Sequence, residues 1–462
     1  MLDKKVEELR DEFFSSLVEI LKIKSVEGKS LPGMPFGEGP NEALEKALEI
    51  CDDLGFNTVN LDGYVGYAEY GTGEDYVAVL GHLDVVPEGD GWMYPPYGAE
   101  IHDGKLYARG VMDDKGPIFA ALYGLKAIKE LQLPLSKRVR IIFGTNEESG
   151  SHDMPYYVER EKAPVAGFTP DGMFPIINGE KGLTMFKLVK NFSKGEEGVN
   201  NIEYIAGGRK ANMVPDYCEA KVTGENLSEV QFALEEYAER TGLKLEGILE
   251  KDALIVKSFG KSAHGSTPEK GINAVSGIMA FLGQLDLPKG DIREFIEFYN
   301  KYINFEVHGE SMNCDLYDDI SGHLSINVGA VDINIEKVSI LLNFRYPVTR
   351  TFEEMITPIE EIIEKYGISI EDMDHEKPLY FSPDSALIKT LQKVYTEYTG
   401  EEATLLSIGG GTYAKTMDNI VAFGPIFPGK PDLDHQPNEC MEIEDLMMCS
   451  KIYAKAIYEL AK

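Results

Sequence analysis

The sequence predicts an α/β protein in which a mostly parallel sheet, flanked by helices, is interrupted by an inserted α+β domain. Three observations support this prediction. Short β-branched apolar runs alternate with helix-like segments over residues 1–180. Residues 181–378 show strand, loop and helix patterns followed by antiparallel strands. The alternation of helix and strand then returns over residues 379–462, so we expect the middle segment to be inserted into the first domain.

The first part of the chain alternates between two kinds of pattern. Residues 40–56 repeat apolar side chains at helical spacing, and residues 115–131 do the same. Residues 76–86 and 138–148 are apolar and rich in β-branched side chains, which is typical of buried strands. In parallel sheets, ligands bind at the carboxyl ends of the strands. The polar residues that follow these apolar runs are therefore candidates for a functional site.

The rest of the chain supports the same division. Residues 252–275 predict a strand, a polar loop and a helix, and residues 323–348 predict antiparallel strands. Residues 384–398 then predict a helix, and residues 405–417 a strand that runs into a glycine loop. A closing helix is expected over residues 444–460.

Composition excludes several classes of function. The 462 residues include 45 Lys and Arg and 78 Asp and Glu, which gives a formal net charge of −33. Such an acidic surface repels phosphate backbones and anionic lipid, so nucleic-acid and membrane partners are not expected. The opening segment lacks a signal-peptide pattern, and no run of about 18 apolar residues is present. The five cysteines show no CxxC spacing, so we expect a cytoplasmic protein without disulfides.

Five short motifs carry candidate chemistry, and each has a simpler structural interpretation. His82 and Asp84 would share one face of a strand, where the carboxylate can fix the tautomer of the imidazole; a histidine at a sheet edge is the alternative. The pairs Asp113–Asp114 and Glu147–Glu148 can equally be helix caps or turn residues. Asp171 and His435 complete the set, in the segments PDG and HQPNE.

Taken together, the five motifs predict a metal centre. Two histidines and several carboxylates, none with a cysteine beside it, form a nitrogen and oxygen ligand set that suits zinc, manganese or cobalt. Pairs of adjacent carboxylates allow one side chain to bind metal while its neighbour stays free. Metal-assisted hydrolysis needs this arrangement, because metals lower the pKa of a bridging water and a free Glu can take its proton.

These motifs also resemble those of a known family. The matching segments are HLDVVPEGDGW, RGVMDDKGP, TNEESGS, PDG, SAHGSTPEKGINA and HQPNE, which span residues 81–439. Together they resemble the dinuclear metallopeptidases related to aminoacylase and carboxypeptidase G. Within that superfamily the chain looks most like PepV-type dipeptidases, also called Xaa-His or β-alanyl dipeptidases. The resemblance implies a zinc-peptidase-like catalytic domain with an inserted lid.

The resemblance also implies roles in a dinuclear site. Asp113 would bridge both metals, Glu147 would be the general base, and Asp84 would orient His82. The peptide bond between Asp113 and Asp114 would be cis. Two divalent ions are expected, with zinc first and manganese or cobalt as alternatives. The metal ligands implied are His82, Asp113, Glu148, Asp171 and His435.

The inserted domain matches the family's lid. His264 corresponds to a histidine that polarises the scissile carbonyl, and Arg345 to an arginine that holds the substrate carboxylate. Asn212 matches a second lid contact, and Gly410, in the segment SIGGGTY, would let the backbone approach that carboxylate. The 93 positions between Asp171 and His264 match the enlarged lid of PepV-type enzymes, so we expect a monomer.

The function that this implies is metal-dependent hydrolysis of dipeptides with broad specificity. One alternative keeps the same dinuclear site but takes N-acyl amino acids, as acetylornithine or succinyl-diaminopimelate deacylases do. A second alternative is a non-catalytic protein that binds metal or peptide. We expect an enzyme, because both the ligands and the unligated Glu147 are present.

Overall fold

The computed structural model describes residues 1–193 and 200–462. Its contacts divide the chain into two compact units. The first comprises Met1–Asn178, Phe381–Leu406 and Gly411–Lys462, and the second comprises Gly179–Tyr380 and Ser407–Gly410. The short segment Ser407–Gly410 differs from the sequence-based division, because it belongs with the inserted unit rather than with the final part of the chain.

A mixed sheet organises the first unit. Its strands, in spatial order, are β1 (Asn57–Leu61), β2 (Val65–Tyr70), β6 (Arg138–Gly144), β3 (Tyr76–His82), β7 (Ala166–Thr169), β21 (Ile420–Ala422), β8 (Ile176–Glu180) and β19 (Leu379–Tyr380), and β20 (Leu405–Ile408) also pairs with β8. The pairs β6–β3, β3–β7 and β7–β21 are parallel. The outer pairs are antiparallel. The predicted α/β class is confirmed, with its parallel strands at the centre of the sheet.

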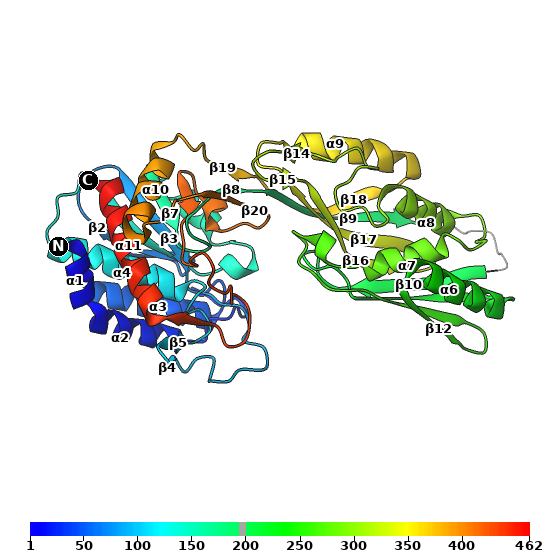
Figure 1. Cartoon of the computed structure of the whole chain (residues 1–462), viewed down its shortest axis with the longest axis horizontal. Helices are drawn as coiled ribbons and strands as arrows, with labels where there is room; N and C mark the ends of the chain where they lie inside the picture. Colours follow the sequence, from blue (N-terminus) through cyan, green and yellow to red (C-terminus); the bar gives the residue numbers. More distant parts are fainter. Residues whose placement is uncertain (194–199) are drawn as a thin grey trace. The chain divides into compact units, whose positions relative to one another are not determined.

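The first unit also contains the α-helices that pack around this sheet. They are α1 (Leu2–Glu8), α2 (Arg10–Leu21), α3 (Glu38–Asp53), α4 (Lys115–Glu130), α5 (Met154–Val158), α10 (Ala386–Thr399) and α11 (Ile443–Ala461). In Figure 1, α11 lies beside α4. A small sheet of β4 (Glu100–His102), β5 (Lys105–Tyr107) and β22 (Cys440–Glu442) and the short turns η1 (Glu147–Ser149) and η4 (Tyr413–Thr416) complete the unit.

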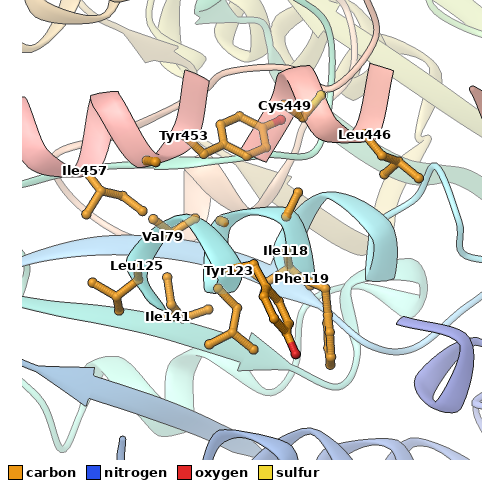
Figure 2. Packing of buried hydrophobic residues seen from close by; sticks show 14 of the residues in the cluster. Val79, Ile118, Phe119, Tyr123, Leu125, Ile141, Leu446, Cys449, Tyr453 and Ile457 are labelled. Atoms are coloured by element: carbon orange, nitrogen blue, oxygen red, sulfur yellow. The ribbon is translucent and has the colours of Figure 1, made fainter. Parts of the chain in front are cut away.

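The core of the first unit lies between α4, α11 and the central strands. Helix α4 is apolar on nearly all sides, and its residues from Lys115 to Ile128 are all buried. Figure 2 shows Ile118 and Leu125 of α4 near Val79 and Ile141 of the sheet. The helix is thus held firmly at the point where it follows Asp113.

The second unit contains one continuous antiparallel sheet. Its strands, in spatial order, are β12 (Lys244–Leu249), β13 (Leu254–Phe259), β11 (Tyr217–Gly224), β10 (Asn200–Gly208), β16 (Ser325–Ile333), β17 (Lys337–Tyr346), β9 (Gly182–Asn191) and β18 (Ser369–Glu376). Its other elements are α6 (Leu227–Thr241), α7 (Ala274–Leu282), α8 (Asp291–Tyr302), α9 (Phe352–Ile363), η2 (Pro268–Lys270), η3 (Glu364–Tyr366) and the hairpin of β14 (Tyr317–Asp318) and β15 (Gly322–His323).

The helices α6, α7, α8 and α9 of the second unit share a core with one face of this sheet. On β17, Ile340, Leu342 and Phe344 belong to that core together with apolar residues of α6, α7, α8 and α9. Because side chains alternate along a strand, the residues between them face the other way. Asn343 and Arg345 therefore lie on the face of the sheet opposite the helices.

None of the helices within residues 1–193 and 200–462 has the length and the apolar character needed to cross a membrane.

Candidate metal centre

The centre is built on the first unit, around the carboxyl end of β3. His82 is the last residue of this strand, which is buried along its whole length. Its Nδ1 lies 3.0 Å from the backbone carbonyl oxygen of Asp84. A carbonyl only accepts hydrogen bonds, so Nδ1 carries a proton and Nε2 points toward the carboxylates of the centre.

Asp84 lies beyond the end of the strand, although its carboxylate approaches His82 as predicted. Because β3 ends at His82, Asp84 is in the following loop, and strand alternation does not set its direction. Its carboxylate oxygen is 3.4 Å from His82 Nδ1. The same carboxylate accepts the backbone N–H groups of Glu147 and Glu148, both at 3.1 Å. Asp84 therefore also holds the turn η1 in place.

Asp113 lies between two imidazoles. Its Oδ1 is 2.8 Å from His82 Nε2, and its Oδ2 is 3.0 Å from His435 Nε2. His435 Nε2 is also 3.0 Å from Glu148 Oε2, and His82 Nε2 is 3.9 Å from Asp171 Oδ2. One carboxylate is thus shared by two groups of potential ligands.

The two groups are compact. His82, Asp113 and Asp171 form one, and Asp113, Glu148 and His435 form the other, with ligand atoms within 4.8 Å of one another in each. These are the five residues that the sequence analysis named as metal ligands. Glu147 is in neither group. The peptide bond between Asp113 and Asp114 is cis, which confirms that expectation.

The electrostatics of the centre show an excess of buried negative charge. Burial alone would raise the pKa of Asp113, but hydrogen bonds from His435 and His82 hold it well below its usual value. Hydrogen bonds to Asp113 and Glu148 raise the pKa of His435 to about 11. Burial, together with the charge of Asp113, raises the pKa of Glu148 to about 7.

The pKa of Glu147 is raised, like that of Glu148. Burial and the nearby charge of Asp171 raise its pKa well above the usual range. Divalent cations would offset this concentration of negative charge. A set of imidazole and carboxylate ligands that share one bridging carboxylate therefore fits a pair of divalent ions.

Glu439 is a residue of the centre to which the sequence analysis gave no role. Its Oε2 accepts Arg109 Nη1 at 2.7 Å and the N–H of Gly110 at 3.0 Å. Its Oε1 accepts the N–H of Met112 at 2.8 Å and that of Asp113 at 3.3 Å. Glu439 thus fixes the loop that presents the shared carboxylate. One sign of a role for Glu439 was present in the sequence, because it stands in the HQPNE segment that also contains His435.

Tyr413 and Asp153 were also missed. The ring of Tyr413 meets that of His82 edge to face, with centroids 6.0 Å apart. Its hydroxyl donates to Asp153 at 2.6 Å. Gly144 makes room for this ring, because a Cβ at that position would overlap the Tyr413 hydroxyl. The sequence pattern indicated the glycine loop next to Tyr413 but gave no sign of a role for Tyr413 itself.

The remaining predicted residues lie in the second unit. Arg345 is almost fully buried and donates to Asn343 Oδ1 at 3.1 Å and to the carbonyl oxygen of Gly409 at 2.5 Å. Gly410 adjoins this contact. His264 is exposed, and its Nδ1 is 2.6 Å from Ser266 Oγ. Asn212 is also exposed, and its carbonyl oxygen accepts the N–H of the residue after His264 at 2.7 Å.

Comparison with known proteins identifies the family. Residues 78–459 match the family described as peptidase family M20/M25/M40. The chain belongs to this family. A Bacillus subtilis (strain 168) protein named "Putative dipeptidase YtjP" is 41% identical over 457 residues, which cover 98% of each chain. The chain is therefore a hydrolase of a metallopeptidase family, and membership implies divalent metal ions.

Solved structures share the fold. The dipeptidase Dug1p from Saccharomyces cerevisiae is 17% identical, with a TM-score of 0.58 over 99% of this chain and 98% of that one. An M20 family metallo-carboxypeptidase from Sulfolobus solfataricus is 18% identical, with a TM-score of 0.59 over 97% and 98%. At these identities the likeness establishes the fold alone.

Proposed function

We propose that this protein is a dipeptidase of broad specificity that uses two divalent metal ions. The observation that carries the proposal is the shared position of Asp113 between two ligand groups, with Glu147 close by but in neither. The names of its curated relatives support the choice of dipeptides as substrates.

The five ligands have distinct places in this proposal. His82 and Asp171 would hold one ion, Glu148 and His435 would hold the other, and Asp113, which belongs to both groups, would serve both. When bound, the ions supply Lewis acidity that polarises the carbonyl and lowers the pKa of the attacking water. Zinc suits the ligand set best, and manganese and cobalt suit it as well.

Glu147 is the proposed general base. Burial and the charge of Asp171 raise the pKa of Glu147, and a less acidic carboxyl group is a stronger acceptor for the proton of water. It would accept a proton from the attacking water and deliver it to the leaving amine. The backbone hydrogen bond to Asp84 fixes the position of the residue for this transfer.

Residues of the second unit would recognise the substrate. We assign the C-terminal carboxylate to Arg345, because a guanidinium binds a carboxylate through two hydrogen bonds. Gly410 would allow the backbone to approach the same group. His264 would stabilise the developing oxyanion, and Asn212 would make a further contact. Such recognition of the carboxylate next to the scissile bond disfavours longer peptides.

We also propose that the enzyme acts as a cytoplasmic monomer. The five cysteines are free and buried, which suits a reducing compartment. The second unit contains one continuous sheet from β12 to β18, and a large inserted unit of this kind suits the enlarged lid on which the expectation of a monomer rests. Sedimentation would test the monomer, together with mixing of His264→Ala and Glu147→Ala chains. A dimer whose mixed chains regain activity would refute the proposal.

The direct test is release of free amino acids from a panel of substrates. The panel contains Leu-Leu, Ala-Ala, β-Ala-His, a tripeptide, N-acetylornithine and N-succinyl-diaminopimelate, each with zinc, manganese, cobalt or EDTA. We expect dipeptide cleavage that EDTA abolishes and that falls sharply for the tripeptide. Cleavage of the acylated substrates alone would make the protein a deacylase, and no cleavage with any metal would favour a binding protein.

A pair of variants tests the role of Glu147. Glu147→Gln should keep its metal content and lose turnover by about 10²- to 10⁴-fold, the usual contribution of a general base. Glu159→Gln, an exposed substitution in the same unit, serves as the matched control and should be unaffected. Retained turnover in Glu147→Gln would contradict the assignment.

A further inference from the structure

We propose that Asn327 and Asn343 are positioning residues that hold Arg345, Asn212 and His264 in a fixed arrangement. The inference rests on the proposed function, which assigns substrate contacts to those three side chains. Neither asparagine would touch the substrate. They would act by linking the strand that carries Arg345 to the loops that carry the other two residues.

Asn343 fixes the guanidinium without neutralising it. Asn343 and Arg345 lie two residues apart on β17, on the face of the sheet opposite the helices. Both are buried, with exposed fractions of 0% and 4%. Asn343 Oδ1 accepts Arg345 Nε at 3.1 Å. A neutral amide leaves the positive charge of Arg345 available to a carboxylate, whereas an aspartate at this position would compete for it.

Asn327 fixes the loop around Asn212. It lies on β16 directly opposite Asn343 and is 1% exposed. Its Nδ2 donates to the carbonyl oxygens of Ala211 and Met213, at 2.7 and 2.8 Å. These two residues flank Asn212, so one side chain holds the loop on both sides of it. Two residues further along the strand, Gly329 has no room for a Cβ because the backbone of Lys210 and Ala211 lies against it.

The loop of Asn212 in turn holds the loop of His264. The N–H of Gly265 donates to the carbonyl oxygen of Asn212 at 2.7 Å, and the N–H of Val214 donates to that of Ala263 at 2.9 Å. His264 lies between these two hydrogen bonds. Its position is therefore set from the sheet through Asn327.

Further contacts lead from His264 back to β17. Ser266, which pairs with His264, lies so close to Gly409 that a Cβ on the glycine would come within 2.8 Å of it. Gly409 accepts a hydrogen bond from Arg345, and Arg345 leads back to Asn343. Asn343 and Asn327 are register partners on β17 and β16, so the two ends of this series of contacts lie on one strand pair. A series of contacts anchored at both ends resists the displacement of any one member.

The two asparagines have complementary unused atoms. Asn343 Nδ2 and Asn327 Oδ1 are buried, and neither has a hydrogen-bond partner within residues 1–193 and 200–462. One is a donor and the other an acceptor, and they belong to residues that face each other across the strand pair. A small shift that joined them would connect Arg345 to the Asn212 loop and would satisfy both groups.

The test compares a dipeptide with the same dipeptide carrying a C-terminal amide. The metal-loaded full chain is used throughout, well below its unfolding temperature. We expect Asn327→Ala to lower kcat/KM for the dipeptide by about 10- to 100-fold, the scale of a misplaced substrate-positioning group. We expect Asn343→Asp to raise KM for the dipeptide at least about tenfold while changing that for the amide much less.

A second readout does not depend on activity. In Asn327→Ala, hydrogen exchange should become faster in the segments 209–214 and 262–267. Asn300→Ala is the matched control, because Asn300 also donates to one backbone carbonyl in the second unit, that of Met279. The control should change neither exchange in these segments nor the preference for dipeptide over amide.

The outcomes separate this inference from the proposed function. If the wild type cleaves N-acyl amino acids instead of dipeptides, the proposed function fails, but those substrates also carry a free carboxylate and allow the same comparison. Unchanged exchange in both segments would overturn the inference, and so would an equal loss on acid and amide substrates in Asn343→Asp.

Discussion

Arg109 Nη1 lies 2.7 Å from Glu439 Oε2, and both side chains are almost completely buried. The ring of Trp92 covers the guanidinium at 5.2 Å. The second oxygen of Glu439 accepts the N–H groups of Met112 and Asp113. A buried ion pair costs desolvation energy, so it contributes little net stability unless its remaining hydrogen-bonding capacity is used. Here that capacity fixes the backbone that presents the shared carboxylate.

Glu439→Gln should therefore weaken metal binding. An amide cannot accept the hydrogen bonds that both carboxylate oxygens accept, so the backbone before Asp113 loses part of its support. We expect affinity for both ions to fall by about 10- to 100-fold, as is typical when a supporting group is removed. Titration calorimetry with zinc or manganese would measure this loss.

A control separates positioning from general destabilisation. Arg109→Lys keeps a positive charge beside Glu439 and leaves its bonds to the backbone of Gly110 and Met112 possible. It should lower thermal stability with a smaller loss of metal affinity. If both variants lost the same stability and Glu439→Gln kept its metal affinity, Glu439 would not act by fixing the backbone that presents Asp113.

Asp84→Asn should lower turnover more than metal affinity. The backbone carbonyl of residue 84 still accepts the proton of His82 in this variant, so the imidazole stays oriented. The turn that carries Glu147 and Glu148 loses one of its two acceptors. We expect kcat to fall by about 100-fold and metal affinity by less than tenfold. Parallel losses of both would show that Asp84 acts through His82 instead.

The sequence was informative about the residues of the centre because ligand chemistry restricts residue type. His82, Asp113, Glu148, Asp171 and His435 follow apolar runs or stand in short polar segments, and their spacing matches a known family. Glu439 and Tyr413 could not be found in this way. Their roles arise from contacts between segments that lie about 260 to 330 residues apart, such as the bond from Tyr413 to Asp153.

The fold shows a similar limit. Strongly periodic segments, such as the one that forms α4, were predicted because an apolar helix and a β-branched strand have distinct patterns. The Asp84 carboxylate approaches His82 as predicted, but the predicted strand was too long. The end of a strand is set by its neighbours, and β3 stops where its pairing with β6 ends, at His82 and Gly144. The assignment of Ser407–Gly410 to the second unit likewise depends on contacts with distant residues such as Arg345.

Asp153→Asn should change the dependence of stability on pH. Burial raises the pKa of Asp153 to about 6, above its value of about 3.8 in the unfolded chain. The folded state therefore favours the protonated form, and stability is lost as pH rises from about 4 through 6. Two pKa units correspond to roughly 3 kcal/mol. The neutral amide avoids this loss, so the variant should gain stability relative to the wild type as pH rises.

Urea unfolding followed by fluorescence would measure this difference. The chain has a single tryptophan, Trp92, which lies in the first unit and reports on it. An asparagine can still accept the bonds from Thr145 and Tyr413 that Asp153 Oδ2 accepts. Asp75→Asn, at an exposed position in the same unit, is the control. A difference between wild type and Asp153→Asn that stays constant from pH 4.5 to pH 8 would contradict the prediction.

Gly124→Ala should destabilise the first unit even though alanine favours helices. Gly124 lies in the middle of α4, where a Cβ would come within 2.9 Å of the backbone nitrogen of Ala454 on α11. Figure 2 shows α11, with Tyr453, running alongside α4, with Ile118. The gain in helix propensity is about 1 kcal/mol. Overpacking at a close helix contact costs about 1 to 3 kcal/mol, so the net effect should be a loss.

The matched variants are Ala454→Gly and the double variant. Ala454→Gly removes the Cβ that a new methyl group at position 124 would meet at 3.1 Å, but it leaves the closer backbone nitrogen in place. The double variant should therefore recover only part of the loss in unfolding midpoint. Because α4 begins two residues after Asp113, Gly124→Ala should also lower metal affinity slightly. If Gly124→Ala instead gained about 1 kcal/mol in stability, the full helix-propensity gain would be realised. The close contact between α4 and α11 would then impose no cost on a methyl group at position 124, which would contradict the prediction.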